Sequence, residues 1–174
     1  MLFRSFLDNL FTGAATRSQY SRYSGGDLPV RSGLAGLVPG GNVARLRAAF
    51  ISQESSGDHT AVNARTGAVG LGQVMPENVG PWTQKYLGRA MSYNEFRYNR
   101  MAQEKLLNAM YTEMFQRHSA EGRSEEEAVR RAAAEWYGGP GAVKHWNNPG
   151  YHANVPGEPN MAQYTKSIWR KYSR

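Results

Sequence analysis

The stretch that decides the fold is residues 51–79, which read ISQESSGDHTAVNARTGAVGLGQVMPENV. It begins at the end of a helical pattern that places Val43, Leu46 and Phe50 on one face together with Glu54. A glutamate therefore closes an apolar stripe. Burial against apolar groups disfavours a charged carboxylate and raises its pKa, which suits a general acid at neutral pH. The pattern predicts that role for Glu54.

Four short motifs follow one another along the chain. They are ESS at 54–56, GAVGLGQ with VMP at 67–76, EWYGGPG at 135–141 and YTKSI at 164–168. In this order and spacing they resemble the motifs of the soluble lytic transglycosylases, which share the goose-type lysozyme fold. The resemblance extends over about residues 43–172. It implies a mainly α, lysozyme-like domain with a small β or loop element.

The same resemblance implies a reaction on peptidoglycan glycan strands. Glu54 would protonate the glycosidic oxygen between MurNAc and GlcNAc. The resulting carboxylate would take the proton of the muramyl C6 hydroxyl, which gives a 1,6-anhydro product without water or a second carboxylate. The motifs assign substrate contacts, or contacts with the acid, to Ser55, Gly70, Gln73, Tyr137 and Tyr164.

The sequence departs from the family pattern at three positions. Gly72 stands where the family usually has Met, Trp136 where it has Tyr, and Tyr137 where it has Asn. These departures affect residues expected to touch the sugar, and they leave the acid in place. They keep open the alternative of a structural virion protein with a degenerate transglycosylase fold.

Three further carboxylates keep a water-using lysozyme open as another alternative. They are Asp58, Glu77 and Glu135. A hydrolytic glycosidase that activates water needs a second carboxylate about 6.5–9.5 Å from its acid. If one of the three faces the cleft at that distance from Glu54, hydrolysis becomes the expected chemistry.

From residue 42 onward the pattern is compact and helical. Capping boxes, glycine stops and apolar stripes predict helices over 42–56, 95–118 and 124–136, a short helix containing Val143 and Trp146, and a last helix over 160–172. Asn42 is the expected N-cap of the first of these. The Gly-rich segment 57–75 is expected to form a loop or small hairpin.

Residues 1–41 are predicted to form a separate arm before the catalytic domain at 42–174. Phe3, Phe6, Leu7 and Leu10 share one face of a possible short helix over 1–11, and the Gly-, Ser- and Arg-rich remainder carries few periodic residues. The apolar face is expected to dock on the domain itself, on a virion or secretion-machine protein or, with weaker support, on a membrane surface.

Composition and charge limit the other function classes. The 174 residues contain no cysteine and carry a formal charge of +7, which favours anionic partners such as nucleic acid, membranes or cell-wall polymers. The basic residues look scattered along the sequence and match no nucleic-acid-binding motif. The four histidines show no spacing typical of metal ligands. We therefore expect no specific nucleic acid, no metal and no cofactor.

The start of the sequence bears on how the protein would reach the cell wall. The start MLFRSFLDNLF lacks the continuous apolar core of a signal peptide, because Asp8 and Asn9 interrupt it. We therefore expect a protein carried in a phage particle that opens the wall during genome entry and acts in the periplasm. The alternative is a periplasmic enzyme of the host.

Overall fold

The computed structural model describes residues 41–119, 122–151 and 159–174. Its helices are α3 (Gly41–Glu54), α4 (Pro76–Leu87), α5 (Tyr93–Arg97), α6 (Arg100–Ser119), α7 (Glu125–Gly138), the 3-10 helix η2 (Pro140–His145) and α8 (Met161–Tyr172). Within these residues, β structure consists of isolated bridge positions, among them antiparallel bridges of Val69 with Val62 and with Val74. The predicted fold class, mainly α with a small β or loop element, is confirmed. None of the described helices is long and apolar enough to cross a membrane.

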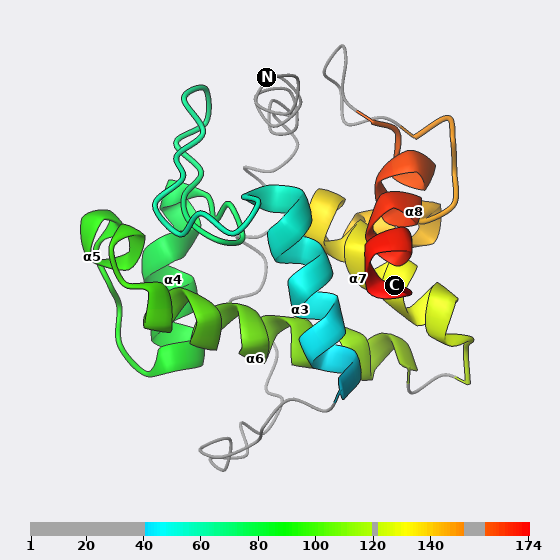
Figure 1. The fold of residues 1–174 in the computed structure, drawn as a ribbon, viewed down its shortest axis with the longest axis horizontal. Helices are drawn as coiled ribbons and strands as arrows, with labels where there is room; N and C mark the ends of the chain where they lie inside the picture. Colours follow the sequence, from blue (N-terminus) through cyan, green and yellow to red (C-terminus); the bar gives the residue numbers. More distant parts are fainter. Residues whose placement is uncertain (1–40, 120–121, 152–158) are drawn as a thin grey trace.

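The helices form two groups around α6 (Figure 1). Helix α6 runs across the molecule, and α3 crosses in front of it. Helices α4 and α5 and the loop 55–75 lie at one end of α6, whereas α7 and α8 lie at the other. Helix α3 packs on both α6 and α8, so its C-terminal end lies between the two groups.

Aromatic side chains fill the contact between α3, α6 and α7. Phe50 and Tyr111 are fully buried and stacked, with ring centroids 4.4 Å apart. Trp136 meets Tyr111 edge-on at 5.1 Å and Phe50 at 5.9 Å. Such pairs add to the hydrophobic gain of burying large rings. They therefore fix where α7 stands relative to the end of α3.

The first predicted helix is correct in place but wrong at both ends. Helix α3 is already present at Gly41, so Asn42 lies inside it and its Oδ1 accepts a hydrogen bond from Arg45 instead of capping the helix. The helix ends at Glu54 and not at Ser56, because Ser56 takes a left-handed φ of 55° and Gly57 one of 90°. The chain therefore turns away directly after Glu54.

The predicted long helix 95–118 is two helices. Ser92 caps α5 by accepting a hydrogen bond from the backbone N–H of Glu95, and α5 ends after one turn. Asn99 then accepts from the N–H of Ala102 and opens α6. The predicted cap at Ser92 is confirmed, but Asn99 caps a second helix and so divides the segment in two.

Two elements differ further from the prediction. Helix α4 is absent from the predicted elements. It contains Gly80 and Pro81, which are unfavourable inside a helix, and the burial of Val79 and Thr83 stabilises it nonetheless. The segment around Val143 forms the 3-10 helix η2.

The last two helices begin as predicted. Ser124 caps α7, and Asn160 and Gln163 form a reciprocal capping box on α8. The arm 1–40 and much of the predicted loop 147–159 lie outside the described residues, so the division of the chain at residue 42 stays a prediction.

Candidate active site

Helix α3 carries Glu54 into the interior at its last residue. The side chain is 1% exposed and lies on the same buried face as Leu46 and Phe50, as predicted from the helical pattern. Burial removes the carboxylate from water and is the main cause that raises the pKa of Glu54 to about 8. At neutral pH the group is therefore mostly a protonated acid with a proton to donate.

The two carboxyl oxygens of Glu54 have different surroundings. The hydroxyl of Tyr164, on α8, donates a hydrogen bond of 2.5 Å to Oε1. Oε2 is buried and makes no hydrogen bond of ordinary geometry within the described part of the chain. The bond from Tyr164, and more weakly the Trp136 side chain, favour the charged form and offset part of the rise in pKa. Tyr164 thus orients one oxygen of the acid, while the other is buried without a hydrogen-bond partner among the described residues.

Tyr164 is held so that it acts as a donor. It is 1% exposed, and its ring stacks on Tyr137 with centroids 4.3 Å apart. Burial and the nearby charge of Glu54 raise the pKa of Tyr164 well above its usual value, so the hydroxyl stays protonated. The Tyr137 hydroxyl donates to the carbonyl of Pro159, next to the start of α8. The third and fourth motifs, far apart in sequence, therefore meet at Glu54.

Ser55 links the end of α3 to the glycine-rich loop. Its hydroxyl donates to the carbonyl of Leu71 at 3.0 Å and accepts from the N–H of Gly57 at 3.2 Å. The side chain is 5% exposed. A substrate contact was predicted for Ser55, but here its hydroxyl bonds to the backbone and holds the loop beside the acid.

Gln73 closes the same loop on itself. Its Nε2 donates to the carbonyl of Gly70 at 3.0 Å, and its φ of 50° is left-handed, which is uncommon for a residue with a side chain. Such backbone strain concentrates at functional sites. Gln73 is largely buried, so its predicted contact with the sugar remains a prediction.

Gly70 is required by a partner that the sequence reading missed. A Cβ at Gly70 would lie 2.3 Å from Oε1 of Gln103, and the φ of Gly70 is +78°. Gln103, 1% exposed, accepts from the N–H of Leu71 and donates to the carbonyls of His59, Phe96 and Arg97. Gln103 thereby fixes the glycine-rich loop to α5 and α6. Its position in the apolar stripe of α6, beside Leu106 and Leu107, was the available signal.

The departure at Gly72 has a packing explanation. A Cβ there would lie 2.5 Å from Cδ2 of Leu107. The Leu107 side chain from α6 therefore fills the space that a larger residue at position 72 would enter. The space beside Gly72 is therefore still apolar, but Leu107 of α6 fills it and not a side chain of the loop.

The three alternative carboxylates lie in different surroundings. Asp58 is exposed and accepts from both the N–H and the hydroxyl of Thr60, which lowers its pKa. Glu77 is exposed in the first turn of α4. Glu135 is 4% exposed but paired, with Arg117 Nη1 at 2.5 Å and His118 Nε2 at 2.8 Å.

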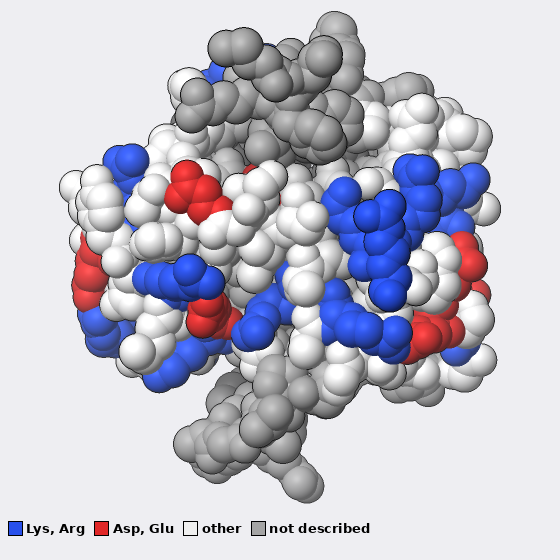
Figure 2. All heavy atoms as spheres, viewed as in Figure 1, with Lys and Arg blue, Asp and Glu red and all other residues white. Residues whose placement is uncertain are grey.

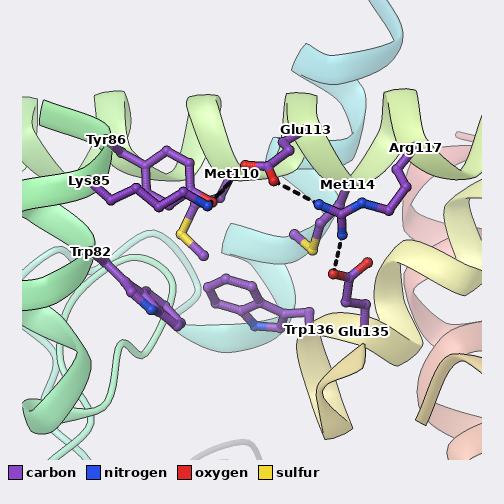
Figure 3. A pocket seen from close by; sticks show the side chains of 9 residues that line it. All are labelled: Trp82, Lys85, Tyr86, Met110, Glu113, Met114, Arg117, Glu135 and Trp136. Atoms are coloured by element: carbon purple, nitrogen blue, oxygen red, sulfur yellow. Dashed lines mark hydrogen bonds and ion pairs between the residues drawn. The ribbon is translucent and has the colours of Figure 1, made fainter. Parts of the chain in front are cut away.

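Glu135 and Trp136 border a pocket between α4, α6 and α7 (Figure 3). Arg117 lies between Glu113 and Glu135 on one side, and the rings of Trp82 and Trp136 lie on the other. The pocket is lined by Trp82, Lys85, Tyr86, Met110, Glu113, Met114, Arg117, Glu135 and Trp136. Trp136 was expected in the groove; it is 9% exposed and mostly part of the aromatic core. Among the described residues no cluster of three potential metal ligands occurs.

Comparison with known protein families gives one finding. A family model described as Transglycosylase SLT domain matches residues 40–154, roughly two thirds of the chain. The matched range includes Glu54, the glycine-rich loop and the third motif; Tyr164 lies beyond it. Comparisons with curated proteins and with solved structures gave no match.

Proposed function

The chain belongs to the Transglycosylase SLT domain family, and we propose that it is a peptidoglycan lytic transglycosylase with Glu54 as its acid and base. One observation carries the assignment to Glu54. Its carboxyl is buried at the end of α3, has a pKa of about 8, and receives a hydrogen bond from Tyr164 on Oε1, while Oε2 has no hydrogen-bond partner among the described residues. A mostly protonated carboxyl suits proton donation to a poor leaving group.

The proposed reaction uses the Glu54 carboxyl twice, first as a proton donor and then as a proton acceptor. Glu54 donates its proton to the glycosidic oxygen as the bond to C1 of MurNAc breaks, and the GlcNAc side leaves as an alcohol. The N-acetyl oxygen of MurNAc stabilises the positive charge at C1. The Glu54 carboxylate then removes the proton of the C6 hydroxyl, whose oxygen bonds to C1 and forms the 1,6-anhydro ring. Glu54 ends protonated, and Tyr164 stabilises the carboxylate in between.

The surroundings of the other carboxylates favour this route over hydrolysis. Glu135 is paired with Arg117 and His118, so its oxygens are not available to activate a water. Asp58 is exposed and its pKa is lowered, which weakens it as a base. A water-using lysozyme would need one of these groups, or Glu77, to act as that base.

Digestion of purified peptidoglycan, with mass spectrometry of the soluble muropeptides, tests the proposal. We expect anhydro-muropeptides from the wild-type protein and none from Glu54→Gln. Hydrated reducing ends that also disappear in Glu54→Gln would instead identify a lysozyme. A folded wild-type protein that releases nothing would favour the structural virion protein.

We further propose that the enzyme is carried in a phage particle, where residues 1–41 bind a tail, portal or ejection protein. The amphipathic pattern of Phe3, Phe6, Leu7 and Leu10, followed by a basic segment, supports a docking role. Proteomics of purified particles tests this. Deletion of residues 1–40 should remove the protein from the particle while peptidoglycan cleavage in solution persists. A protein found only in the periplasm of uninfected cells would contradict it.

A further inference from the structure

Helix α8 carries a row of cations on its outer side. Lys166, Arg170 and Arg174 are spaced four residues apart and are all exposed, with Arg174 just beyond the end of the helix. Residues four apart on a helix are neighbours on one face, about 6 Å apart along the axis. Figure 2 shows a cluster of Lys and Arg side chains over this helix and its C-terminal end. We call Lys166, Arg170 and Arg174 the α8 stripe.

The charge of the α8 stripe is not neutralised within the described residues. None of the three side chains forms an ion pair there. Glu125, which contacts α8 through Tyr172, accepts from Arg45 and from the Tyr172 hydroxyl. The pKa of Lys171 is lowered, mainly by burial and further by the positive charges of Arg174 and Arg170. The second effect is expected where positive charges accumulate.

Placing these cations in a row lowers the stability of the helix, and no contact among the described residues offsets this. Like charges at i and i+4 destabilise a helix slightly. Cations in the last turn are favoured by the helix dipole, which accounts for Arg170, but Lys166 lies in the middle of α8. All the large apolar residues of the helix face the core or its edge, so the stripe does not support packing. The stripe is therefore an exposed, positively charged surface that can meet an external anion.

We propose that the α8 stripe binds the carboxylates of the stem peptides in peptidoglycan and thereby holds the glycan strand at the active site. This inference rests on the proposed function. Its structural basis is that one helix carries both features: Tyr164 of α8 points inward to Glu54, and the stripe is exposed on the outer side of the same helix. A strand that carries carboxylates at regular intervals can be held there while its backbone lies near the acid.

The surface fits other polyanions less well. Insertion into an anionic membrane needs apolar side chains on the exposed face, and the exposed residues there are Gln163, Lys166, Arg170, Ser173 and Arg174. Duplex DNA would be neutralised at only about three phosphates, which gives weak binding. A covalently continuous wall polymer needs only modest affinity per site, because many sites act together.

The test measures co-sedimentation with purified peptidoglycan sacculi in a Glu54→Gln background, so that binding is separated from cleavage. The test variant replaces the stripe by Lys166→Gln, Arg170→Gln and Arg174→Gln. A matched control removes the same charge elsewhere, by Arg100→Gln, Lys105→Gln and Lys144→Gln, all at exposed positions. Thermal unfolding checks that both remain folded.

We expect the stripe variant to bind sacculi about tenfold more weakly at low salt and the control to change less than about twofold. The difference should vanish at high salt. It should also vanish on sacculi whose carboxylates have been amidated with carbodiimide. Equal loss in both variants, or stripe-dependent binding that survives amidation, would overturn the inference.

Two probes separate the other polyanions, and the digestion assay separates the proposed function. A larger stripe-dependent loss on duplex DNA or on vesicles of anionic phospholipid would refute the choice of ligand. Anhydro products together with unchanged binding of the stripe variant would refute only this inference. Stripe-dependent binding without any cleavage by the wild type would refute only the proposed function.

Discussion

Glu54 and Glu135 are both nearly completely buried glutamates, 1% and 4% exposed, yet their surroundings differ. Glu135 faces Arg117 and His118, and both of its oxygens have a partner. Glu54 faces no cation among the described residues; the Tyr164 hydroxyl donates to its Oε1, and the Trp136 side chain acts on it more weakly. Both glutamates are thus buried, but Glu135 pairs with a cation, whereas Glu54 is hydrogen-bonded to a neutral tyrosine.

The difference explains why only one of them suits acid chemistry. A buried carboxylate beside a cation is stabilised in its charged form and ties two helices together, here α6 and α7. A buried carboxyl without a cation keeps its proton, as the raised pKa of Glu54 indicates. Each prediction below tests one side of this contrast.

The largest effect is expected from removing the acid. Glu54→Gln keeps the shape of the side chain but has no proton to donate, so release of muropeptides should fall by about 100- to 10,000-fold. Rates of release from labelled sacculi, with circular dichroism to verify folding, provide the measurement. A folded Glu54→Gln protein within tenfold of the wild-type rate would exclude Glu54 as the acid.

The same substitution should increase stability in alkaline solution. In the wild type, the pKa of Glu54 is about 8 when folded and near its usual value of 4.5 when unfolded. Between these values the unfolded chain binds fewer protons than the folded one, so the wild-type free energy of unfolding falls as pH rises. The loss is on the order of 4–5 kcal/mol and is complete above about pH 8.

Glu54→Gln has no such proton and therefore serves as the reference. Denaturant unfolding of both proteins from about pH 4 to about pH 9 measures the difference, because all other groups titrate alike in the two. The advantage of Glu54→Gln should grow across this range. A difference that stays constant with pH would show that burial does not hold the proton on Glu54.

Glu135→Gln should lower stability and leave the rate of cleavage nearly unchanged, which is the reverse of the effects expected for Glu54→Gln. It breaks the ion pair with Arg117 and removes the carboxylate facing His118, so the free energy of unfolding should fall by about 1–3 kcal/mol. The rate of peptidoglycan cleavage by the folded protein should stay within a few-fold. The surface variant Glu104→Gln is the control for stability, with an expected change below about 0.5 kcal/mol. A stable but inactive Glu135→Gln would instead favour the water-using mechanism.

The sequence predicted local patterns better than long-range partners. The apolar stripe of α3 predicted the burial of Glu54, and capping residues predicted where α7 and α8 begin, because both signals depend on neighbouring residues. Helix α4 escaped prediction because its stability comes from burial of Val79 and Thr83, which overrides Gly80 and Pro81. Local propensity is a weak guide when packing decides.

The same limit applies to the site. The motifs placed Glu54 and Tyr164 near one another through the resemblance, but nothing in the sequence showed that Glu135 pairs with Arg117, 18 residues away. Gln103 bonds through one amide to four residues, two in the loop 55–75 and two in α5, and each contact depends on how the loop and α6 meet. The basic residues that look scattered in sequence gather in part on α8 only because a helix brings every fourth residue to one side.

The smallest effect, and the finest test of the contrast, is expected from Tyr164→Phe. The Tyr164 hydroxyl favours the charged form of Glu54, so its loss should raise the pKa of Glu54 further above about 8. The rate of muropeptide release should fall about tenfold, because the carboxylate formed during the reaction loses its donor. The alkaline limb of the pH–rate profile should move to higher pH, since the acid holds its proton longer.

Tyr137→Phe is the matched control for this change. It removes a hydroxyl of the same kind from the ring stacked on Tyr164, but that hydroxyl donates to the carbonyl of Pro159 and not to Glu54. A loss of packing or of loop anchoring would lower the rate in both variants and leave the alkaline limb in place. Only the loss of the hydrogen bond to Glu54 moves the limb, so an unmoved limb in Tyr164→Phe would mean that Tyr164 acts through packing alone.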